Sequence, residues 1–144
     1  MKDIVNLDKL DEFVGKFSER LANDKPVIIA LEGDLGSGKT TFGQKLGYLL
    51  GVKEPVISPT FIIHREYKTN VPDRIFHHLD LYRLNSKNEF DELEFSSLLR
   101  DKNMVIVEWA DKFKDEINSL GDNARLIWIK FGHVTENERS VEVT

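Results

Sequence analysis

Residues 27–40 read Val-Ile-Ile-Ala-Leu-Glu-Gly-Asp-Leu-Gly-Ser-Gly-Lys-Thr, and this stretch decides the fold. Its first five residues form a continuous aliphatic run, which is typical of a strand buried on both faces of a parallel sheet. Residues 33–40 match the pattern G-x-x-x-x-G-K-[ST] at every fixed position. Apolar residues at positions 42, 46, 49 and 50 then predict a helix that ends at Gly51. A strand, a glycine-rich turn and a helix in this order predict a phosphate-binding loop.

The loop supplies the first expected nucleotide contacts. Backbone N–H groups of the turn and the N-terminus of the helix converge on an anion there. Lys39 is expected to reach the β- and γ-phosphates, and the Thr40 hydroxyl to bind Mg²⁺. The alternative is a glycine-rich turn whose lysine sits on a solvated helix start. The residues expected to contact nucleotide in this loop are Asp34, Leu35, Gly36, Ser37, Gly38, Lys39 and Thr40.

Composition sets the broad class of the protein. The chain has 144 residues, of which 40% are hydrophobic and 31% charged, so we expect one globular domain over residues 1–144. Twenty basic residues against 25 acidic ones give a net charge of −5, which argues against a broad nucleic-acid-binding surface. Ten acidic residues precede Pro72 and 15 follow it, which predicts an acidic face in the second half.

Cysteine is absent, which excludes disulfides, thiolate zinc sites and cysteine nucleophiles. The four histidines, at positions 64, 77, 78 and 133, lack the spacing of a metal site along the sequence. The N-terminus carries no apolar signal core, and the aliphatic run at 27–31 is too short to span a bilayer. We therefore expect a soluble cytoplasmic protein that does not contact a membrane.

The remaining elements indicate an α/β fold. Strands are expected at 61–67, 75–82, 104–107, 126–129 and 141–143, the first two of them paired antiparallel. Helices are expected at 7–21, from a capping box at Ser86 and Glu89, and at 111–120. The prediction is a single P-loop NTPase domain with a mainly parallel central sheet flanked by helices, plus antiparallel strand pairs.

Two acidic residues lie at predicted strand ends. Glu108 directly follows the buried run at 104–107, so it is expected at the carboxyl edge of the sheet, where α/β folds bind ligands. Strand alternation places His78, Asp80 and Tyr82 on one face, and we favour Mg²⁺ binding by Asp80, directly or through water. The alternatives are a solvated carboxylate at 108 and an exposed face on which Asp80 pairs with Arg83 or a histidine.

Two further features have two interpretations each, and a third is interpreted as structural. Thr60, in Ser58-Pro59-Thr60, could lie near the γ-phosphate as part of a switch segment or belong to an ordinary turn. Trp109 could stack on a base or close the site, or it could lie in the core. The neighbouring histidines at 77 and 78 point to opposite faces of their strand, and we interpret both as structural.

Four sequence blocks together resemble the bacterial ATPase family of tRNA threonylcarbamoyladenosine biosynthesis, the TsaE family. The resemblance covers nearly the whole chain and implies a small P-loop protein that binds ATP and Mg²⁺ and hydrolyses ATP slowly alone. It also implies partner proteins that install threonylcarbamoyl on adenosine 37 of tRNAs, with tRNA contacted indirectly or weakly by this chain. The blocks are Leu-Glu-Gly-Asp-Leu-Gly-Ser-Gly-Lys-Thr-Thr-Phe (31–42), Ser-Pro-Thr-Phe (58–61), His-Leu-Asp-Leu-Tyr-Arg-Leu (78–84) and Val-Glu-Trp (107–109).

The resemblance also implies residue roles. Lys39, Thr40 and Thr41 would hold phosphate and metal, and Thr60 and Asp80 would complete the metal and γ-phosphate side. Glu108 would assist hydrolysis and stand near the metal, so the catalytic set is Lys39, Asp80 and Glu108 and the metal set is Thr40, Asp80 and Glu108. Trp109 joins the nucleotide contacts. Many family members have proline after the Glu-Trp pair, where this chain has Ala110.

Two other functions share the same loop. A small-molecule P-loop kinase uses the same lysine and metal, but it needs an acceptor pocket and usually a lid that carries arginines. The arginines at 65, 74, 83 and 100 are scattered along this sequence. The second alternative is a non-catalytic switch, in which nucleotide changes only the surface presented to a partner. A GTPase is disfavoured because no Asn-Lys-x-Asp string occurs.

Overall fold

A seven-stranded sheet organises the chain in the computed structural model, which describes residues 2–6, 9–19, 21, 25–34, 36–57, 59 and 61–144. The four central strands, in the order β6-β2-β5-β4, are parallel, and antiparallel pairs flank them at both edges. This confirms the predicted fold class. The strands are β1 (Lys2–Asn6), β2 (Val27–Glu32), β3 (His64–Lys68), β4 (Ile75–Asp80), β5 (Met104–Glu108), β6 (Arg125–His133) and β7 (Glu138–Val143), in the spatial order β1-β7-β6-β2-β5-β4-β3.

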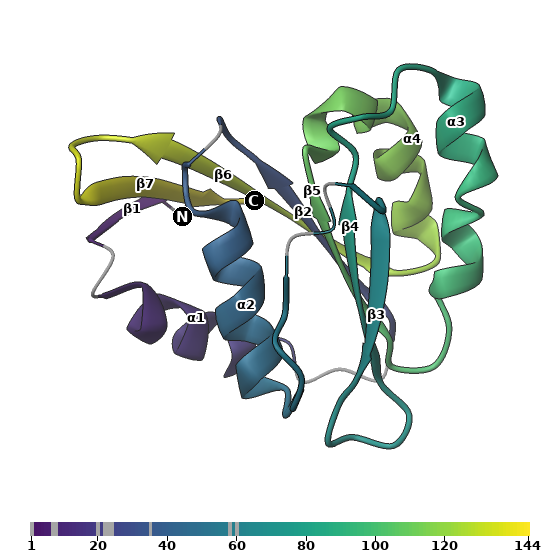
Figure 1. Ribbon diagram of the computed structural model, residues 1–144, viewed down its shortest axis with the longest axis horizontal. Helices are drawn as coiled ribbons and strands as arrows, with labels where there is room; N and C mark the ends of the chain where they lie inside the picture. The colour runs from purple at the N-terminus through teal and green to yellow at the C-terminus, as the bar shows by residue number, and fades with distance from the viewer. Residues whose placement is uncertain are drawn as a thin grey trace.

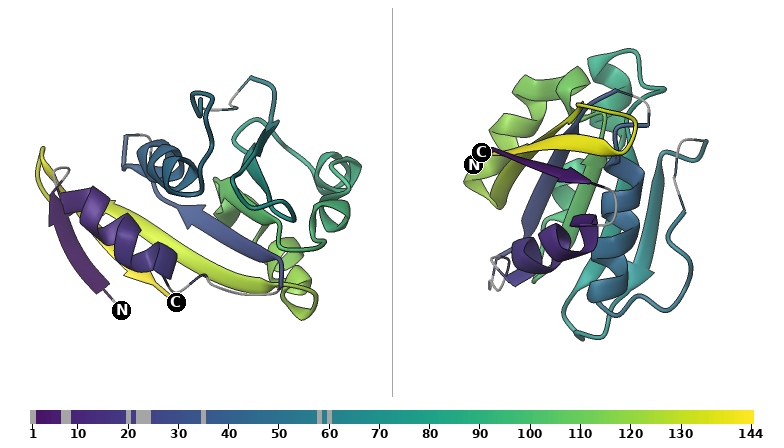
Figure 2. Two further views of the ribbon diagram at one scale, coloured as in Figure 1. Left: turned by 90° about the horizontal axis from the view of Figure 1, so that it is seen from below. Right: turned by 90° about the vertical axis from the view of Figure 1, so that its left-hand side faces the viewer.

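Helices cover both faces of the sheet (Figures 1 and 2). The helices α1 and α2 pack against each other and on one face, whereas α3 and α4 lie on the other. Each face thus has its own hydrophobic core. The helical segments are α1 (Leu10–Glu19), α2 (Lys39–Leu49), α3 (Lys87–Glu92) and α4 (Lys114–Asn118), with short 3-10 turns η2 (Phe95–Leu98), η3 (Ala110–Phe113) and η4 (Ser119–Asp122).

The central strand β2 owes its place to its aliphatic run. Val27, Ile29 and Leu31 enter the core under α1 and α2, and Ile28 and Ala30 enter the core on the α3 and α4 side. All five side chains are completely buried. Burial of a Val, Leu or Ile side chain contributes roughly 1.5–3 kcal/mol, so only a strand in the middle of a covered sheet suits this run.

Helix α2 begins and ends at glycines in left-handed conformations. Gly38 has φ 109° before the helix, and Gly51 has φ 82° just after it. Within the helix, a Cβ built on Gly47 would lie 2.8 Å from Cγ2 of Val56 and 3.2 Å from Cε2 of Phe76. The small residue therefore allows α2 to approach the sheet closely.

The structure corrects several predicted boundaries. The strand expected at 61–67 begins only at His64, because Pro59 accepts hydrogen bonds from the N–H groups of Ile62 and Ile63 and Ile63 has φ 70°. The strand expected at 75–82 ends at Asp80. The helix expected at 111–120 is divided among η3, α4 and η4, and β1 was not predicted. The helix expected from residue 7 starts at Leu10, with residues 7 and 8 outside the described part.

The predicted start of α3 at Ser86 is confirmed. The Ser86 hydroxyl accepts a hydrogen bond from the N–H of Glu89 at 3.2 Å, and the Glu89 carboxylate accepts one from the N–H of Asn85 at 3.1 Å. In the part of the chain that the structure describes, no helix is both long and apolar enough to cross a membrane.

Candidate functional site at the carboxyl edge of the sheet

The parallel strands β2, β4 and β5 end at the same edge of the sheet. The glycine-rich loop leaves β2 there, and Asp80 at the end of β4 is the register partner of Glu108 at the end of β5. Strands that run in parallel deliver their C-terminal residues to one place, which is where open α/β sheets bind ligands. The fold therefore brings together the loop and both carboxylates that the sequence predicted.

The backbone of the loop depends on glycine. Gly36 has φ 74° and Gly38 has φ 109°, conformations that other residues rarely adopt. A Cβ on Gly33 would lie 2.7 Å from Oγ of Ser37 and 2.8 Å from the carbonyl oxygen of Phe131, so a larger residue does not fit. Asp34 is exposed, and its carbonyl accepts the N–H of Ser37 at 3.1 Å. Leu35, predicted as part of the site, lies outside the described residues.

Lys39 is folded into the site. Only 4% of the residue is exposed, its Nζ donates to the carbonyl oxygen of Gly33, and that nitrogen lies 3.6 Å from the ring centroid of Trp109. Burial lowers the pKa of Lys39, while the charges of Glu108, Asp111, Asp80 and Asp34 act in the opposite direction. The alternative of a lysine on a solvated helix start is therefore wrong.

Trp109 borders the lysine and packs against the margin of the core on the α3 and α4 side. The residue is half-buried, has φ 58°, and packs its ring against Tyr82 with the centroids 5.0 Å apart. The left-handed backbone at this position turns the chain as it leaves β5, so that the indole faces the ammonium group of Lys39. Trp109 therefore contacts both the core on the α3 and α4 side and the lysine, and its contact with a nucleotide stays a prediction.

Glu108 is held at both of its carboxylate oxygens. The Thr40 hydroxyl donates to Oε1 at 2.8 Å, and Nε2 of His78 lies 2.6 Å from Oε2. Glu108 is 3% exposed and forms the last residue of β5, so the alternative of a solvated carboxylate is wrong. The first turn of α2 and the end of β5 are joined by this contact, which links residues 68 positions apart.

His78 is a site residue that the sequence analysis interpreted as structural only. Its side chain is completely buried beside Gly43 of α2, and its Nδ1 has no hydrogen-bond partner among the described residues. Strand alternation had correctly placed His78 on the same face as Asp80, and this was the feature of the sequence that could have indicated a place in the site. The partner across the strands, Glu108, could not be inferred from alternation because strand order was unknown.

Asp80 is buried, with 3% of the residue exposed, so the alternative of an exposed sheet face is wrong. Its Oδ1 accepts the N–H of Tyr82 at 2.9 Å, which orients the carboxylate at the strand end. Tyr82 itself lies beyond β4 and is 47% exposed. Thr41 is exposed in the first turn of α2. Thr60 and Ser58 lie outside the described residues, so their predicted place is not settled.

The donor set fits a nucleotide phosphate and a hard cation. The loop offers glycine backbone where a Cβ would clash, and the Ser37 hydroxyl is 1% exposed with no hydrogen-bond partner among the described residues. A hydroxyl and two carboxylates, from Thr40, Asp80 and Glu108, are the oxygen ligands that Mg²⁺ prefers. The residues present therefore suit both ATP phosphates and Mg²⁺.

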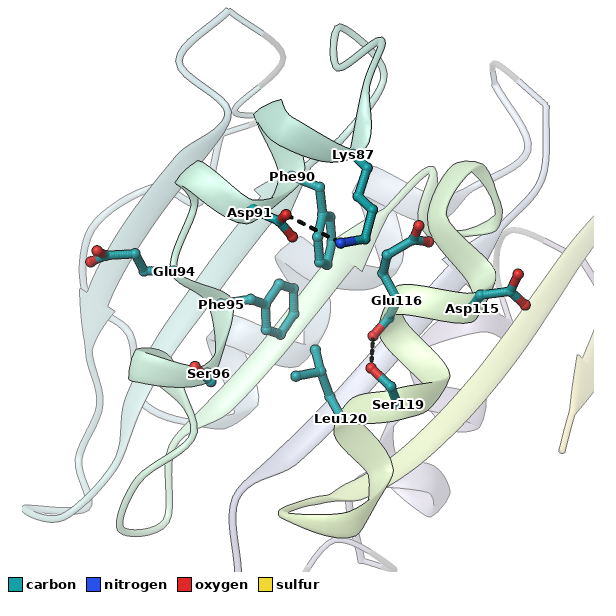
Figure 3. Close-up of a pocket in the computed structure, with 10 residues that line it drawn as sticks. All are labelled: Lys87, Phe90, Asp91, Glu94, Phe95, Ser96, Asp115, Glu116, Ser119 and Leu120. Carbon is teal, nitrogen blue, oxygen red and sulfur yellow. Dashed lines mark hydrogen bonds and ion pairs between the residues drawn. The ribbon is translucent and has the colours of Figure 1, made fainter.

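A separate hollow of about 410 Å³ lies between α3 and α4, on the face of the sheet opposite to α1 and α2 (Figure 3). Its floor is apolar, with Phe90 and Phe95 stacked at a centroid distance of 5.9 Å. Its rim carries Asp91, Glu94, Asp115 and Glu116 together with Lys87, whose ammonium group pairs with Asp91 at 3.3 Å.

Comparisons with known proteins agree with this geometry. The family model "Threonylcarbamoyl adenosine biosynthesis protein TsaE" matches residues 5–141. Proteins named tRNA threonylcarbamoyladenosine biosynthesis protein TsaE match from Rickettsia conorii (36% identity, 78% of this chain and 69% of that protein) and Rickettsia typhi (37%, 72% and 76%). A third, from Bacillus subtilis, is 36% identical over 62% of this chain and 54% of its own length.

A solved structure supports the fold. The crystal structure of Bacillus subtilis YdiB superposes with a TM-score of 0.67 over 98% of this chain and 82% of that one, at 24% sequence identity. The family model spans almost the whole sequence and includes the glycine-rich loop, Asp80 and Glu108. The chain therefore belongs to the TsaE family.

Proposed function

We propose that this chain binds and hydrolyses ATP in a Mg²⁺-dependent way and is required for threonylcarbamoyl modification of adenosine 37 in tRNA. Its relatives carry the name of that biosynthesis. The observation that supports catalysis most directly is the contact between Thr40 and Glu108 at 2.8 Å, beside the buried Lys39. This contact joins the phosphate loop to a carboxylate held at the strand end.

The loop and the first turn of α2 would bind the nucleotide. The backbone of Gly36 and Gly38 would contact the phosphates, and Lys39 would leave the carbonyl of Gly33 to place its charge on the β- and γ-phosphates. Mg²⁺, held by Thr40 with Asp80 and Glu108 nearby, would neutralise charge that develops on the phosphate oxygens. Trp109 and Thr41 would border the nucleotide, and Thr60 would lie on the γ-phosphate side.

Glu108 would orient the attacking water and take its proton. The carboxylate has one oxygen against Thr40 and the other against His78, so its plane is fixed before substrate arrives. A positioned carboxylate base contributes typically 10²–10⁴-fold to a proton-transfer step. His78 supports this by holding the carboxylate in place and does not itself reach the substrate.

Recognition of tRNA would lie in partner proteins of the threonylcarbamoyl transfer complex. This chain carries a net charge of −5, which gives weak attraction to a phosphate backbone at physiological salt. Its role would be to couple ATP turnover to the partners, through segments near the γ-phosphate whose order depends on nucleotide. We place it in the cytoplasm, where tRNA modification takes place.

Phosphate release, measured with and without Mg²⁺ and with and without candidate partners, tests the proposal. We expect slow Mg²⁺-dependent release by the chain alone, faster release with partners, and loss of both ATP binding and release in Lys39→Ala. Transfer of the γ-phosphate to a small molecule, with no release to water, would favour the kinase alternative. ATP binding that alters partner affinity without any phosphate release would favour the switch. Unchanged ATP affinity in a folded Lys39→Ala variant would contradict the proposed nucleotide site.

A further inference from the structure

A group of metal-ligand side chains lies on the edge hairpin of the sheet, away from the nucleotide site. In the β3–β4 pairing, Glu66 is the register partner of His77, and His64 is the partner of Leu79. Paired residues on neighbouring strands point to the same face of the sheet, and so do residues two positions apart on one strand. His64, Glu66 and His77 therefore project on the same side. The two histidines are 13 positions apart along the chain, which is why their spacing did not predict a site.

The three ligand atoms are close enough for one ion. They all lie within 4.8 Å of one another: Nε2 of His64 is 2.9 Å from Nδ1 of His77, and that Nδ1 is 3.9 Å from Oε2 of Glu66. Tetrahedral zinc, with bonds of roughly 2.0–2.2 Å, requires its ligand atoms to stand about 3.4 Å apart. The observed distances lie on either side of this value, so small side-chain shifts complete the geometry.

Both histidines are neutral, and because Nε2 of His64 and Nδ1 of His77 share a hydrogen bond, metal binding requires one ring to move its proton to its other nitrogen. Burial lowers the pKa of His77 to about 4, with His64 and Arg100 acting in the same direction, and burial also lowers the pKa of His64. Both rings are therefore neutral at pH 7, and the contact between His77 and Glu66 is not an ion pair. Neutral imidazole nitrogens together with one carboxylate are ligands that zinc and neighbouring transition metals accept.

Exposure gives the site an entrance. His77 is buried, His64 is half-buried and Glu66 is exposed, on a hairpin whose strand β3 forms the edge of the sheet. An ion can therefore enter from solvent and retain water as a further ligand. On the inner side, Nδ2 of Asn103 lies 3.4 Å from Nε2 of His77 and also donates to the carbonyl of Leu98 at 3.1 Å.

Asn103 also limits the affinity. Metal on Nδ1 of His77 requires the ring proton on Nε2, which then faces an amide group that donates. Loss of the 3.4 Å contact between Asn103 and His77 costs little free energy, but no acceptor then pairs with the ring N–H of His77. Together with the absence of a fourth protein ligand from the group, this predicts micromolar binding, weaker than that of four-ligand structural zinc sites.

We infer that His64, Glu66 and His77 form a binding site for a transition-metal ion of the zinc class, which fastens the edge strand β3 to β4. The site is independent of the proposed ATPase activity, because His77 and His78 point to opposite faces of β4 and only His78 contacts Glu108.

The test is titration of the metal-free full chain with Zn²⁺ by calorimetry and with Co²⁺ by visible absorption, in the absence of nucleotide. We expect one equivalent bound in the micromolar range, four- or five-coordinate Co²⁺ bands, and a higher melting temperature with Zn²⁺. His64→Gln should weaken binding at least tenfold while the protein stays folded, because this ring is only half-buried. Glu66→Gln, at an exposed position, is the second variant and should weaken binding as well.

Two control variants make the result specific. His133→Gln removes an exposed histidine of β6 and should leave Zn²⁺ affinity unchanged. Glu108→Gln tests whether Zn²⁺ binds instead at the nucleotide site, and it should also leave the affinity unchanged. No binding at about 100 µM Zn²⁺, equal binding by wild type and His64→Gln, or loss of binding in Glu108→Gln would each overturn the inference.

Discussion

Nε2 of the buried His78 lies 2.6 Å from Oε2 of Glu108, whose other oxygen accepts the Thr40 hydroxyl. A buried group in such a contact fixes the orientation of the carboxylate that it touches. The ring is enclosed by the sheet and by α2, with a Cβ built on Gly43 only 3.5 Å from its Cε1. Rotation of Glu108 away from the phosphate loop is therefore opposed on two sides.

Removal of the His78 contact should slow turnover more than it weakens ATP binding. In His78→Ala, Glu108 loses one of its two fixed contacts, and we expect kcat for phosphate release to fall by about 10–100-fold with little change in KM. His78→Gln, which keeps an N–H donor, should recover part of the rate. His133→Gln is the control for loss of an imidazole, and melting curves check that each variant folds. A rise in KM alone, with kcat unchanged, would argue against a positioning role.

Glu108 and Asp80 should act on different quantities. Glu108→Gln keeps an oxygen for the Thr40 hydroxyl but cannot take a proton, so ATP affinity should persist while turnover falls by about 10²–10⁴-fold. Asp80→Asn keeps the acceptor for the N–H of Tyr82 but loses its charge, so it should raise the Mg²⁺ concentration needed for half-maximal rate. Phosphate release measured across a Mg²⁺ titration separates the two effects. Parent-like curves from both variants would assign the carboxylates to structure only.

Much of the site followed from the sequence because its signals are local. The glycine pattern fixes its own backbone, and the short aliphatic runs of β2 and β5 favour buried strands, so the positions of Lys39, Thr40 and Glu108 at one sheet edge are predicted. His78 was not assigned to the site, because its contact with Glu108 depends on β4 lying beside β5. The sequence pattern predicts both strands but does not show that they are adjacent in the sheet.

Other elements depend on tertiary contacts that the sequence does not display. The strand β1, with the sequence Lys-Asp-Ile-Val-Asn, has weak alternation and exists through its pairing with β7. Residues 61–63 are apolar enough to suggest a strand, but the carbonyl of Pro59 accepts the N–H groups of Ile62 and Ile63 in a local turn. The His64 and His77 rings meet only through the hairpin register. For β1 and for the two histidines, a partner distant in sequence decides the local structure.

Two glycines in helices should respond to alanine with opposite signs. In α2, a Cβ at Gly47 meets Val56 at 2.8 Å, so overpacking of about 1–3 kcal/mol outweighs the helix-propensity gain of about 1 kcal/mol. In α1, a Cβ at Gly15 meets nothing within 4 Å, so Gly15→Ala should stabilise the protein by up to about 1 kcal/mol. Urea unfolding with a common m-value measures both changes. Equal changes in the two variants would contradict the packing of α2 against the sheet.

The contact between Lys39 and Trp109 should report nucleotide binding. The ammonium group lies 3.6 Å from the indole centroid and donates to Gly33, and it must leave both partners to reach a phosphate. A cation at this distance alters the emission of the indole, so ATP should produce a saturable fluorescence change in a Trp128→Phe protein, where Trp109 is the remaining tryptophan. The matched control, Trp109→Phe, retains Trp128, which is hydrogen-bonded to Asn118, and should show no response. The change should also vanish in Trp128→Phe combined with Lys39→Met, which keeps the length of the side chain without its charge. A response of the same size from Trp128 alone, or an unchanged response without the lysine charge, would show that ATP does not draw Lys39 away from Trp109.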